Sequence, residues 1–208
     1  MMASRMGAGI DLVVKFGGSL FSRGDLRDIC SSLDYSLREV PAIIVPGGGI
    51  LADEVRRLDM LHSLGPESSH WMAVLAIDQN GLMLADLLPR GIPVRSFEGF
   101  AASWEEGRLP VFLPGELLFE TDPLPKNWDV TSDSIACWAA VSMGAKNLLF
   151  LKDNVPECSM TAKVLSNQGW LDKTFPDQFE AFEGEAWIGN GCFPEEAVNG
   201  QGIIEILR

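Results

Sequence analysis

The sequence predicts an α/β fold built around a mainly parallel β-sheet. Short apolar stretches, such as residues 12–16 and 42–45, alternate along the chain with longer helical patterns. The short stretches are apolar at nearly every position and show no regular alternation of apolar and polar residues. Strands of a parallel sheet are covered by helices on both faces, which produces this kind of uninterrupted apolar stretch.

The individual elements follow from the same patterns. We expect strands at residues 12–16, 42–45, 92–97, 110–113, 147–151, 186–188 and 203–207. Apolar residues that recur every three or four positions predict helices at 25–40, 51–61, 69–88 and 132–143. Helix 69–88 is apolar on nearly every face, which is typical of a buried helix or one at a subunit interface. Residues 154–184 are polar without a clear pattern, and a boundary between two lobes is expected at 119–127.

Length and charge limit the classes of function. With 208 residues, of which 47% are hydrophobic, the chain can bury the core of one large domain or two small lobes. A net charge of −13 argues against a nucleic-acid partner, because binding to a phosphate backbone needs a basic face. A small phosphorylated ligand stays compatible with this charge, since a few local donors outweigh a distant field.

The sequence also predicts a cytoplasmic protein. Residues 1–9 contain no continuous apolar region, so we expect no signal peptide. No apolar stretch reaches the roughly 18 residues of a membrane-spanning helix. The four cysteines form no Cys-x-x-Cys pair, which favours reduced thiols over disulfides or a zinc site.

Two junctions between a strand and glycines indicate chemistry with phosphates. Lys15 lies near the end of the first apolar stretch, directly before Phe16 and the pair Gly17 and Gly18. The second stretch leads into three glycines, residues 47–49. Glycine N–H groups can approach an anion closely, and a lysine adds a positive charge beside them. Two neighbouring anion sites fit a phosphoryl donor and its acceptor, although each glycine cluster alone also fits a tight turn.

Neither junction has a standard nucleotide-binding signature. The chain lacks G-x-x-x-x-G-K-[ST], so it is not a P-loop protein. It also lacks G-x-G-x-x-G after the first strand, which gives a dinucleotide-binding fold little support.

Acidic and hydroxyl residues gather where the segment 128–134 enters a helix. One interpretation is helix capping, with Thr131 or Ser132 accepting hydrogen bonds from free N–H groups. The other is a site in which a carboxylate holds Lys15 or helps to bind a magnesium ion carried by ATP. Lys152 and Asp153 end the next apolar strand, where parallel sheets bind ligands, although a solvated charge pair is the simpler explanation there.

Four motifs are together similar to those of the amino acid kinase superfamily, which includes aspartate, acetylglutamate and uridylate kinases. They are Lys-Phe-Gly-Gly-Ser at 15–19, Pro-Gly-Gly-Gly at 46–49, Thr-Ser-Asp-Ser-Ile-Ala at 131–136 and Leu-Lys-Asp at 151–153. The resemblance implies an ATP-dependent kinase with a three-layer αβα sandwich formed by a single domain, residues 1–208. An N-terminal part, about 1–120, would bind the acceptor, and a C-terminal part, about 121–208, would bind ATP with Mg²⁺.

The same resemblance implies roles for individual residues. Lys15 and Asp133 would be catalytic, with Lys15 on the transferred phosphoryl group and Asp133 orienting lysines. Contacts to the nucleotide would come from Gly17, Gly18, Ser19, Lys152 and Asp153. Contacts to the acceptor would come from Gly47, Gly48, Gly49, Asp129 and Thr131. No metal ligand of the protein itself is assigned.

Within the superfamily the chain looks most like the small kinases of methanofuran biosynthesis, which phosphorylate (aminomethyl)furanmethyl phosphate with ATP. This similarity rests on the short length and on stretches 70–73, 78–81 and 128–133. The aminomethyl group of such an acceptor needs a carboxylate partner, which Asp78 or Asp129 could supply. Asp78 also fits a polar residue at a subunit interface.

Three alternatives stay open. The acceptor could be another small carboxylate or a nucleoside monophosphate. Many relatives carry a second active-site lysine late in the chain, and Lys163 and Lys173 match no such motif, so a non-catalytic nucleotide-binding or oxyanion-binding protein is also conceivable. The apolar helix 69–88 fits a homo-oligomer, or in a third interpretation a structural subunit of a larger complex.

Overall fold

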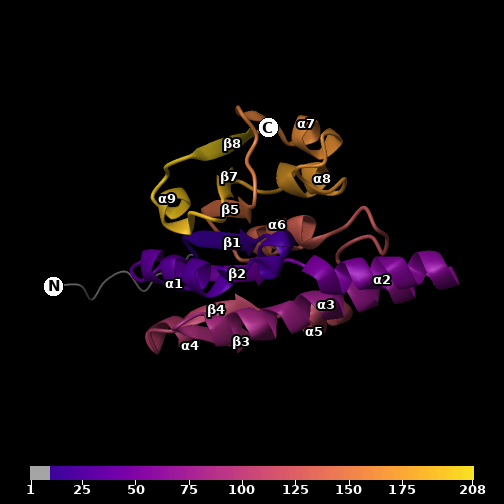
Figure 1. The fold of residues 1–208 in the computed structure, drawn as a ribbon, viewed down its shortest axis with the longest axis horizontal. Coiled ribbons are helices and arrows are strands. Elements are labelled where there is room, and N and C mark those ends of the chain that lie inside the picture. Colours follow the sequence, from indigo (N-terminus) through magenta and orange to yellow (C-terminus); the bar gives the residue numbers. More distant parts are fainter. Residues whose placement is uncertain (1–9) are drawn as a thin grey trace.

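The computed structural model describes residues 10–208 and shows one central sheet covered by helices (Figure 1). The expectation about a signal peptide concerns residues 1–9 and lies outside the described part. Within that part the sheet has eight strands in the order β3-β4-β2-β1-β5-β7-β8-β6. The strands are β1 (Leu12–Phe16), β2 (Ala42–Pro46), β3 (Gly91–Val94), β4 (Leu109–Phe112), β5 (Asn147–Lys152), β6 (Met160–Thr161), β7 (Glu185–Asn190) and β8 (Ile203–Leu207).

The sheet is mainly parallel, which confirms the predicted fold class. Strands β1 to β5 and β7 run in one direction, and β8 pairs antiparallel with β7. Every residue of β1, β2 and β4 is buried. Burial on both faces explains why these stretches are apolar at nearly every position.

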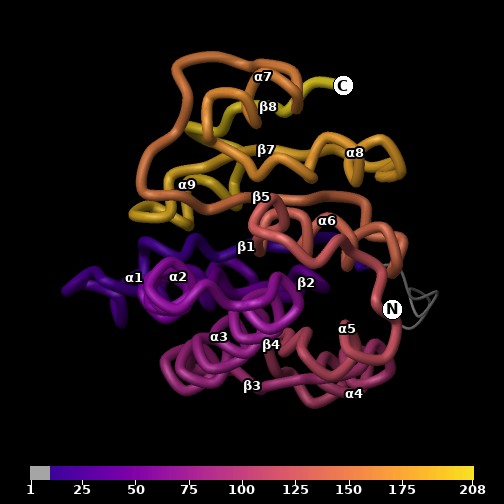
Figure 2. The backbone as a smooth tube through the Cα atoms, turned by 90° about the vertical axis from the view of Figure 1, so that its right-hand side faces the viewer, coloured from indigo at the N-terminus to yellow at the C-terminus, as the bar shows by residue number. Residues whose placement is uncertain are grey.

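Helices cover both faces of the sheet and complete the three layers. They are the 3₁₀ helix η1 (Gly18–Ser22), α1 (Leu26–Ser36), α2 (Gly49–His62), α3 (Pro66–Leu87), α4 (Glu98–Glu105), α5 (Gly115–Thr121), α6 (Ser132–Ser142), α7 (Ala162–Asn167), α8 (Phe175–Glu180) and α9 (Pro194–Val198). In Figure 2, α1 and α9 lie on one side of the strands, and α4, α5, α6 and α8 lie on the other.

The core is divided by the sheet into two clusters. Val13 and Phe150 pack on the face that carries α6, whereas Val14 and Leu151 pack on the face that carries α1. Successive residues of a strand point to opposite faces, so one strand contributes to both clusters. This alternation also decides where the charged residues at the strand ends point.

Several boundaries differ from the expected ones. The helix expected at 25–40 ends at Ser36, and the strand expected at 92–97 ends at Val94 because the chain turns into α4. Residues 154–184, which carry no clear sequence pattern, contain β6, α7 and α8. Among residues 10–208, no helix combines the length and apolar character needed to cross a bilayer.

Candidate active site

Two lysines reach the same edge of the sheet from adjacent strands. The parallel register pairs Lys15 of β1 with Phe150 of β5, and Lys152 follows Phe150 by two residues. Residues two apart on a strand share a face, so both lysines point toward the face that carries α6. Asp133 lies in the first turn of α6 and meets them there.

The three side chains form a buried ionic cluster. Lys15 Nζ lies 2.9 Å from Asp133 Oδ1, and Lys152 Nζ lies 3.2 Å from Asp133 Oδ2. Lys15 and Asp133 are each 5% exposed. Because two ammonium groups share one carboxylate, the cluster carries a net charge of +1. A buried excess of positive charge favours a bound anion.

The electrostatics hold Asp133 in its ionised form. Burial alone would raise the pKa of Asp133, but Lys15 and Lys152 outweigh burial and lower the pKa to about 2. Burial lowers the pKa of Lys152, and the neighbouring Asp133 opposes that change. Asp133 is therefore suited to orienting the two lysines, and poorly suited to accepting a proton near neutral pH.

The two glycine loops pack against each other, backbone to backbone. A Cβ atom on Gly17 would lie 2.5 Å from the carbonyl oxygen of Leu151, and one on Gly18 would lie 2.6 Å from the nitrogen of Gly49. Gly49 has a φ of 49°, in the left-handed region that glycine tolerates best. The glycines are thus required for a close approach of two loops, which a tight turn alone does not need.

Asn80 of α3 fixes the second glycine loop from behind. Its Nδ2 donates hydrogen bonds to the carbonyl oxygens of Gly47 and Gly48, at 2.8 and 2.7 Å. With these carbonyls turned toward Asn80, the amide groups of the loop keep a fixed orientation. Asn80 is 2% exposed, so this contact belongs to the interior of the protein.

Capping and site chemistry coexist at the start of α6. Thr131 caps the helix, because its Oγ1 accepts a hydrogen bond of 3.3 Å from Asp133 N. The carboxylate of Asp133 is left to bind the lysines. Neither interpretation of this segment therefore excludes the other.

Asp172 is a second, partly buried carboxylate behind the cluster. It accepts hydrogen bonds from both the N–H and the hydroxyl of Thr131, at 2.8 and 2.9 Å, and from both groups of Ser134, at 2.9 and 2.5 Å. It also accepts from Phe175 N of α8, at 2.8 Å. Burial, and next the charge of Asp133, raise the pKa of Asp172. Asp172 ties the starts of α6 and α8 together.

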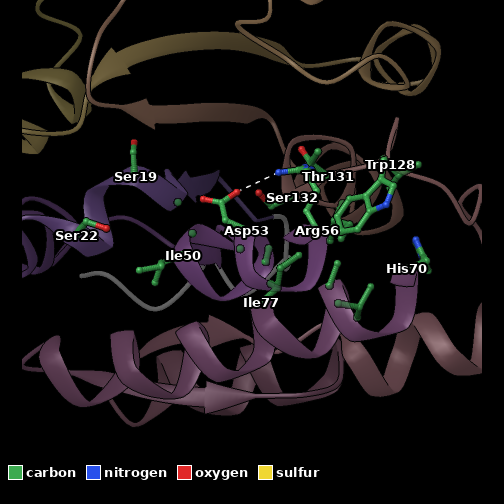
Figure 3. A pocket seen from close by; sticks show the side chains of 18 residues that line it. Ser19, Ser22, Ile50, Asp53, Arg56, His70, Ile77, Trp128, Thr131 and Ser132 are labelled. Atoms are coloured by element: carbon green, nitrogen blue, oxygen red, sulfur yellow. Dashed lines mark hydrogen bonds and ion pairs between the residues drawn. The ribbon is translucent and has the colours of Figure 1, made fainter. Parts of the chain in front are cut away.

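A cavity of about 570 Å³ adjoins the glycine loops and the start of α6. Figure 3 shows Ser19 and Ser22 at one end of it and His70 and Trp128 at the other. Its lining residues come mainly from the glycine loops, α2, α3 and the segment before α6: Gly18, Ser19, Ser22, Gly48, Gly49, Ile50, Ala52, Asp53, Arg56, His70, Ala73, Val74, Ile77, Trp128, Val130, Thr131, Ser132 and Ile135. This volume suits a small organic molecule.

The structure brings most of the expected site residues to this region. Among them, Gly18, Ser19, Gly48, Gly49 and Thr131 line the cavity. Gly17 lies against the end of β5, and Gly47 lies against Gly18, so both belong to the packed loops.

The two carboxylates considered for an aminomethyl group lie elsewhere. Asp78 Oδ1 accepts a hydrogen bond of 3.1 Å from Gly115 N at the start of α5, and burial raises the pKa of Asp78. Asp129 forms a 3.1 Å ion pair with Lys173. Neither residue is among those that line the cavity.

The second lysine of the ionic cluster is Lys152. Lys173 is paired with Asp129, and its side chain is 77% exposed, whereas Lys152 binds Asp133 directly. Lys163 lies on α7, in a separate hollow. The cluster thus has two lysines although the late motif of many relatives is missing.

Sequence reasoning missed five residues of this region. They are Asp53, Arg56, Asn80, Trp128 and Asp172. Asp53 and Arg56 fall at polar positions of the helix that follows the glycines, and polar positions of an amphipathic helix ordinarily face solvent. Asn80 ends a polar stretch, residues 78–80, in a largely apolar helix, and such a stretch is a local signal of a buried polar contact.

Comparisons with known proteins identify the family of this chain. The model of the "Amino acid kinase family" matches residues 12–155, which include the two lysines, the glycine loops and Asp133. This chain belongs to the amino acid kinase family. A relative in Methanocaldococcus jannaschii, "[5-(aminomethyl)furan-3-yl]methyl phosphate kinase", is 24% identical over 202 residues, which cover 90% of this chain and 91% of that protein.

Solved structures show the same fold over nearly the whole length. UMP kinase from Ureaplasma parvum superimposes with a TM-score of 0.73 at 16% identity and covers 98% of both chains. Carbamate kinase from Giardia lamblia, solved with bound AMP-PNP, has a TM-score of 0.61 at 12% identity and covers 98% of this chain and 100% of its own. At these identities the likeness concerns the fold.

Proposed function

We propose that this member of the amino acid kinase family transfers the γ-phosphoryl group of ATP to (aminomethyl)furanmethyl phosphate, forming the diphosphate. The observation that carries the proposal is the buried cluster of Lys15, Asp133 and Lys152 beside two packed glycine loops. Phosphoryl transfer needs positive charge and correct placement more than covalent help from the protein, and this cluster offers both.

The reaction requires no general base. The second pKa of a phosphate monoester is about 6, so the acceptor is mostly a dianion at neutral pH. One of its oxygens attacks the γ-phosphorus of ATP and forms the new P–O bond. The bond from the γ-phosphorus to the oxygen bridging it to the β-phosphorus breaks, and its electron pair leaves with ADP. No proton changes hands, which fits an Asp133 whose pKa is about 2.

The residues at the strand ends take complementary roles in this proposal. Lys15 contacts the phosphoryl group during transfer, with Asp133 holding it in place. Lys152 lies on the side of the donor phosphates, and backbone N–H groups of Gly17, Gly18 and Ser19 donate to the same phosphates. The acceptor phosphate binds at Gly47, Gly48 and Gly49, next to Thr131.

Asp153 has a carboxylate oxygen that could bind a magnesium ion. Its Oδ1 is buried and has no hydrogen-bond partner among the described residues, although Arg23 Nη1 lies 3.9 Å away. Within residues 10–208 no group of three or more His, Cys, Asp or Glu side chains could hold a metal by itself. Asp153 would therefore hold a magnesium ion that arrives with ATP, and such an ion neutralises phosphate charge.

The acceptor is proposed from the cavity and from the named relative together. A space of about 570 Å³ with apolar walls such as Val74, Ile77 and Ile135 accommodates a single small ring. The relative that carries the matching name aligns over 90% of this chain. Asp129, bound to Lys173, can reach the acceptor only by leaving that ion pair, so we place it at the margin of the site.

Location and assembly complete the proposal. All four cysteines are free in the structure, which is compatible with a cytoplasmic enzyme that uses cellular ATP. Helix α3 exposes Leu75, Leu82 and Met83, spaced so that they share one face, and we propose that this face joins two copies of the chain.

The experiment is an acceptor panel with ATP and Mg²⁺, in which ADP and the phosphorylated product are both measured. The panel contains (aminomethyl)furanmethyl phosphate, UMP, acetylglutamate, glutamate and aspartate. We expect one ADP for each diphosphate formed from the furan acceptor, and little turnover of the others. If the enzyme phosphorylates UMP or a carboxylate instead, the proposed acceptor is wrong and that compound takes its place. If ATP binds but no compound of the panel is phosphorylated, the result favours a non-catalytic binding protein.

A further inference from the structure

The cavity carries one negative and one positive side chain in its wall. Among the described residues that line it, Asp53 is the one acid and Arg56 the one lysine or arginine. Both come from α2, one helical turn apart, and Arg56 Nη1 lies 3.0 Å from Asp53 Oδ1 (Figure 3). This pair faces the same space as the glycines that the proposed function assigns to the acceptor phosphate.

The geometry points to Asp53 as the residue that selects an acceptor with a primary amine, by pairing with its ammonium group while the acceptor phosphate lies at the glycine loops. This inference rests on the proposed function and specifies how its acceptor is recognised. The alternatives for the same role, Asp78 and Asp129, bind Gly115 and Lys173 and do not line the cavity.

Asp53 is free enough to bind a ligand. The side chains of Asp53 and Arg56 are 71% and 44% exposed, and an exposed ion pair of this kind contributes little to stability because water and salt screen it. A carboxylate accepts hydrogen bonds at both oxygens, so an ammonium group can bind Asp53 Oδ2 while Arg56 keeps Oδ1. Replacing water around Asp53 with a bound ammonium therefore breaks no strong contact.

Arg56 is held in place by a second contact, which keeps the pair at the cavity. Its guanidinium lies over the ring of Trp128, with 4.6 Å from Cζ to the ring centroid. Trp128 Nε1 in turn donates a 2.6 Å hydrogen bond to Asp59 Oδ2 of the same helix. Trp128 thus holds Arg56 against the wall, and Arg56 keeps the carboxylate of Asp53 beside it.

The acceptor would span the cavity between two opposite charges. Its phosphate would lie at the glycine loops, its ring would contact apolar residues of α3 and α6 such as Ile77 and Ile135, and its ammonium would reach Asp53. A neutral acceptor of the same shape would fill the cavity without using Asp53. Discrimination by a charge pair of this kind exceeds what shape alone achieves.

The same helix provides a matched control. Glu54 and Arg57 form an equivalent i,i+3 ion pair, 2.7 Å long, one residue further along α2, and neither lines the cavity. Asp53→Asn and Glu54→Gln therefore remove similar charges from the same helix, but only the first changes the cavity.

The test compares (aminomethyl)furanmethyl phosphate with its hydroxymethyl analogue for wild type, Asp53→Asn and Glu54→Gln. We expect Asp53→Asn to raise KM for the amine at least tenfold with little change in kcat, and to leave KM for the analogue unchanged. Glu54→Gln should behave as wild type with both. Equal effects of Asp53→Asn on the two acceptors, or no effect on either, would overturn the assignment.

Calorimetric binding of both compounds to the same three proteins separates this inference from the proposed function, since it needs no turnover. If the wild type binds the amine at least tenfold more tightly than the analogue and Asp53→Asn removes the difference, Asp53 has the assigned role even if no product forms. If the wild type shows no preference for the amine, the assignment is wrong whatever the activity of the enzyme.

Discussion

At the scale of single residues, the central feature is a carboxylate shared by two lysines. Asp133 keeps Lys15 and Lys152 within 2.9 and 3.2 Å of itself, at the end of two adjacent strands. Without Asp133, two buried ammonium groups would repel each other and turn apart. Asp133 therefore holds both lysines in position, which in the proposed function is the position that contacts phosphate.

A substitution of Asp133 should affect the rate more than the binding of substrates. Asp133→Asn keeps the shape of the side chain but removes the charge that orients the lysines. We expect kcat to fall more than tenfold, which corresponds to about 1.4 kcal/mol or more in the barrier. Steady-state kinetics with saturating ATP measures the change. An unchanged kcat would mean that Asp133 only stabilises the start of α6 and does not orient the lysines for catalysis.

The low pKa of Asp133 also predicts how stability depends on pH. A carboxyl group with a pKa of about 2 in the folded protein, against 3.8 as its ordinary value, stabilises the fold above the ordinary pKa. That contribution, about 2 kcal/mol, is lost as the pH falls through the folded pKa. The gap in unfolding free energy between wild type and Asp133→Asn should thus be constant above about pH 5 and shrink toward pH 2.

Denaturant unfolding at several pH values measures this gap. The control is Asp177→Asn, which removes an exposed carboxylate on α8, away from the cluster. A gap for Asp133→Asn that stays the same from pH 6 down to the lowest accessible pH would contradict the assigned electrostatics.

At the scale of secondary-structure elements, carboxylates from outside a helix accept hydrogen bonds from its first N–H groups. The carboxylate of Asp78 on α3 accepts a hydrogen bond from the N–H of Gly115 at the start of α5. Asp172 does the same for the starts of α6 and α8. The contacts at α5 and α6 come from residues 37 and 38 positions away and supply acceptors that local capping would otherwise provide, whereas the contact at α8 is local.

This arrangement explains which elements the sequence could predict. The buried strands and the long helices have apolar patterns of their own, so they were found with boundary errors of a few residues. Helices α5 and α8 have seven and six residues, too few for a periodic pattern, and the first N–H of α5 is satisfied by a residue 37 positions away. The same holds for the site: motifs identified Lys15, Asp133 and the glycines, whereas Asp53 and Asp172 depend on tertiary packing.

Asp172 should therefore link the start of α8 to the active site. Asp172→Asn keeps one acceptor oxygen but introduces a donor facing N–H and hydroxyl groups, so α6 loses part of its anchoring. We expect a fall in kcat with little change in KM for ATP, together with a loss of about 1–3 kcal/mol in unfolding free energy.

Restoring the carboxylate distinguishes this positioning role from a general loss of stability. Asp172→Glu should recover part of the kcat that Asp172→Asn loses, because it again offers two acceptor oxygens. Asp177→Asn, on the exposed side of α8, should leave kcat unchanged. Loss of stability in Asp172→Asn with kcat intact at a temperature where it is folded would contradict the link.

At the scale of the whole molecule, the exposed face of α3 predicts a dimer. Leu75, Leu82 and Met83 are 47, 48 and 41% exposed and lie at i, i+7 and i+8 of the helix. Light scattering at micromolar concentration should give twice the chain mass of 22.7 kDa. Leu82→Lys should reduce the measured mass, whereas Val164→Lys, at an exposed apolar position of α7, should not. A wild type that is monomeric throughout would contradict this assembly.

The central claim is that the cluster around Lys15 transfers a phosphoryl group from ATP to the acceptor, and the most direct measurement is product formation by Lys15→Ala. Without Lys15, the remaining pair of Lys152 and Asp133 is neutral, so the fold should survive while the charge for the transferred group is lost. We predict that the wild type forms diphosphate and ADP in equal amounts and that Lys15→Ala loses about 100-fold or more in kcat, with nearly unchanged thermal unfolding. A folded Lys15→Ala that forms product at the wild-type rate would contradict the account.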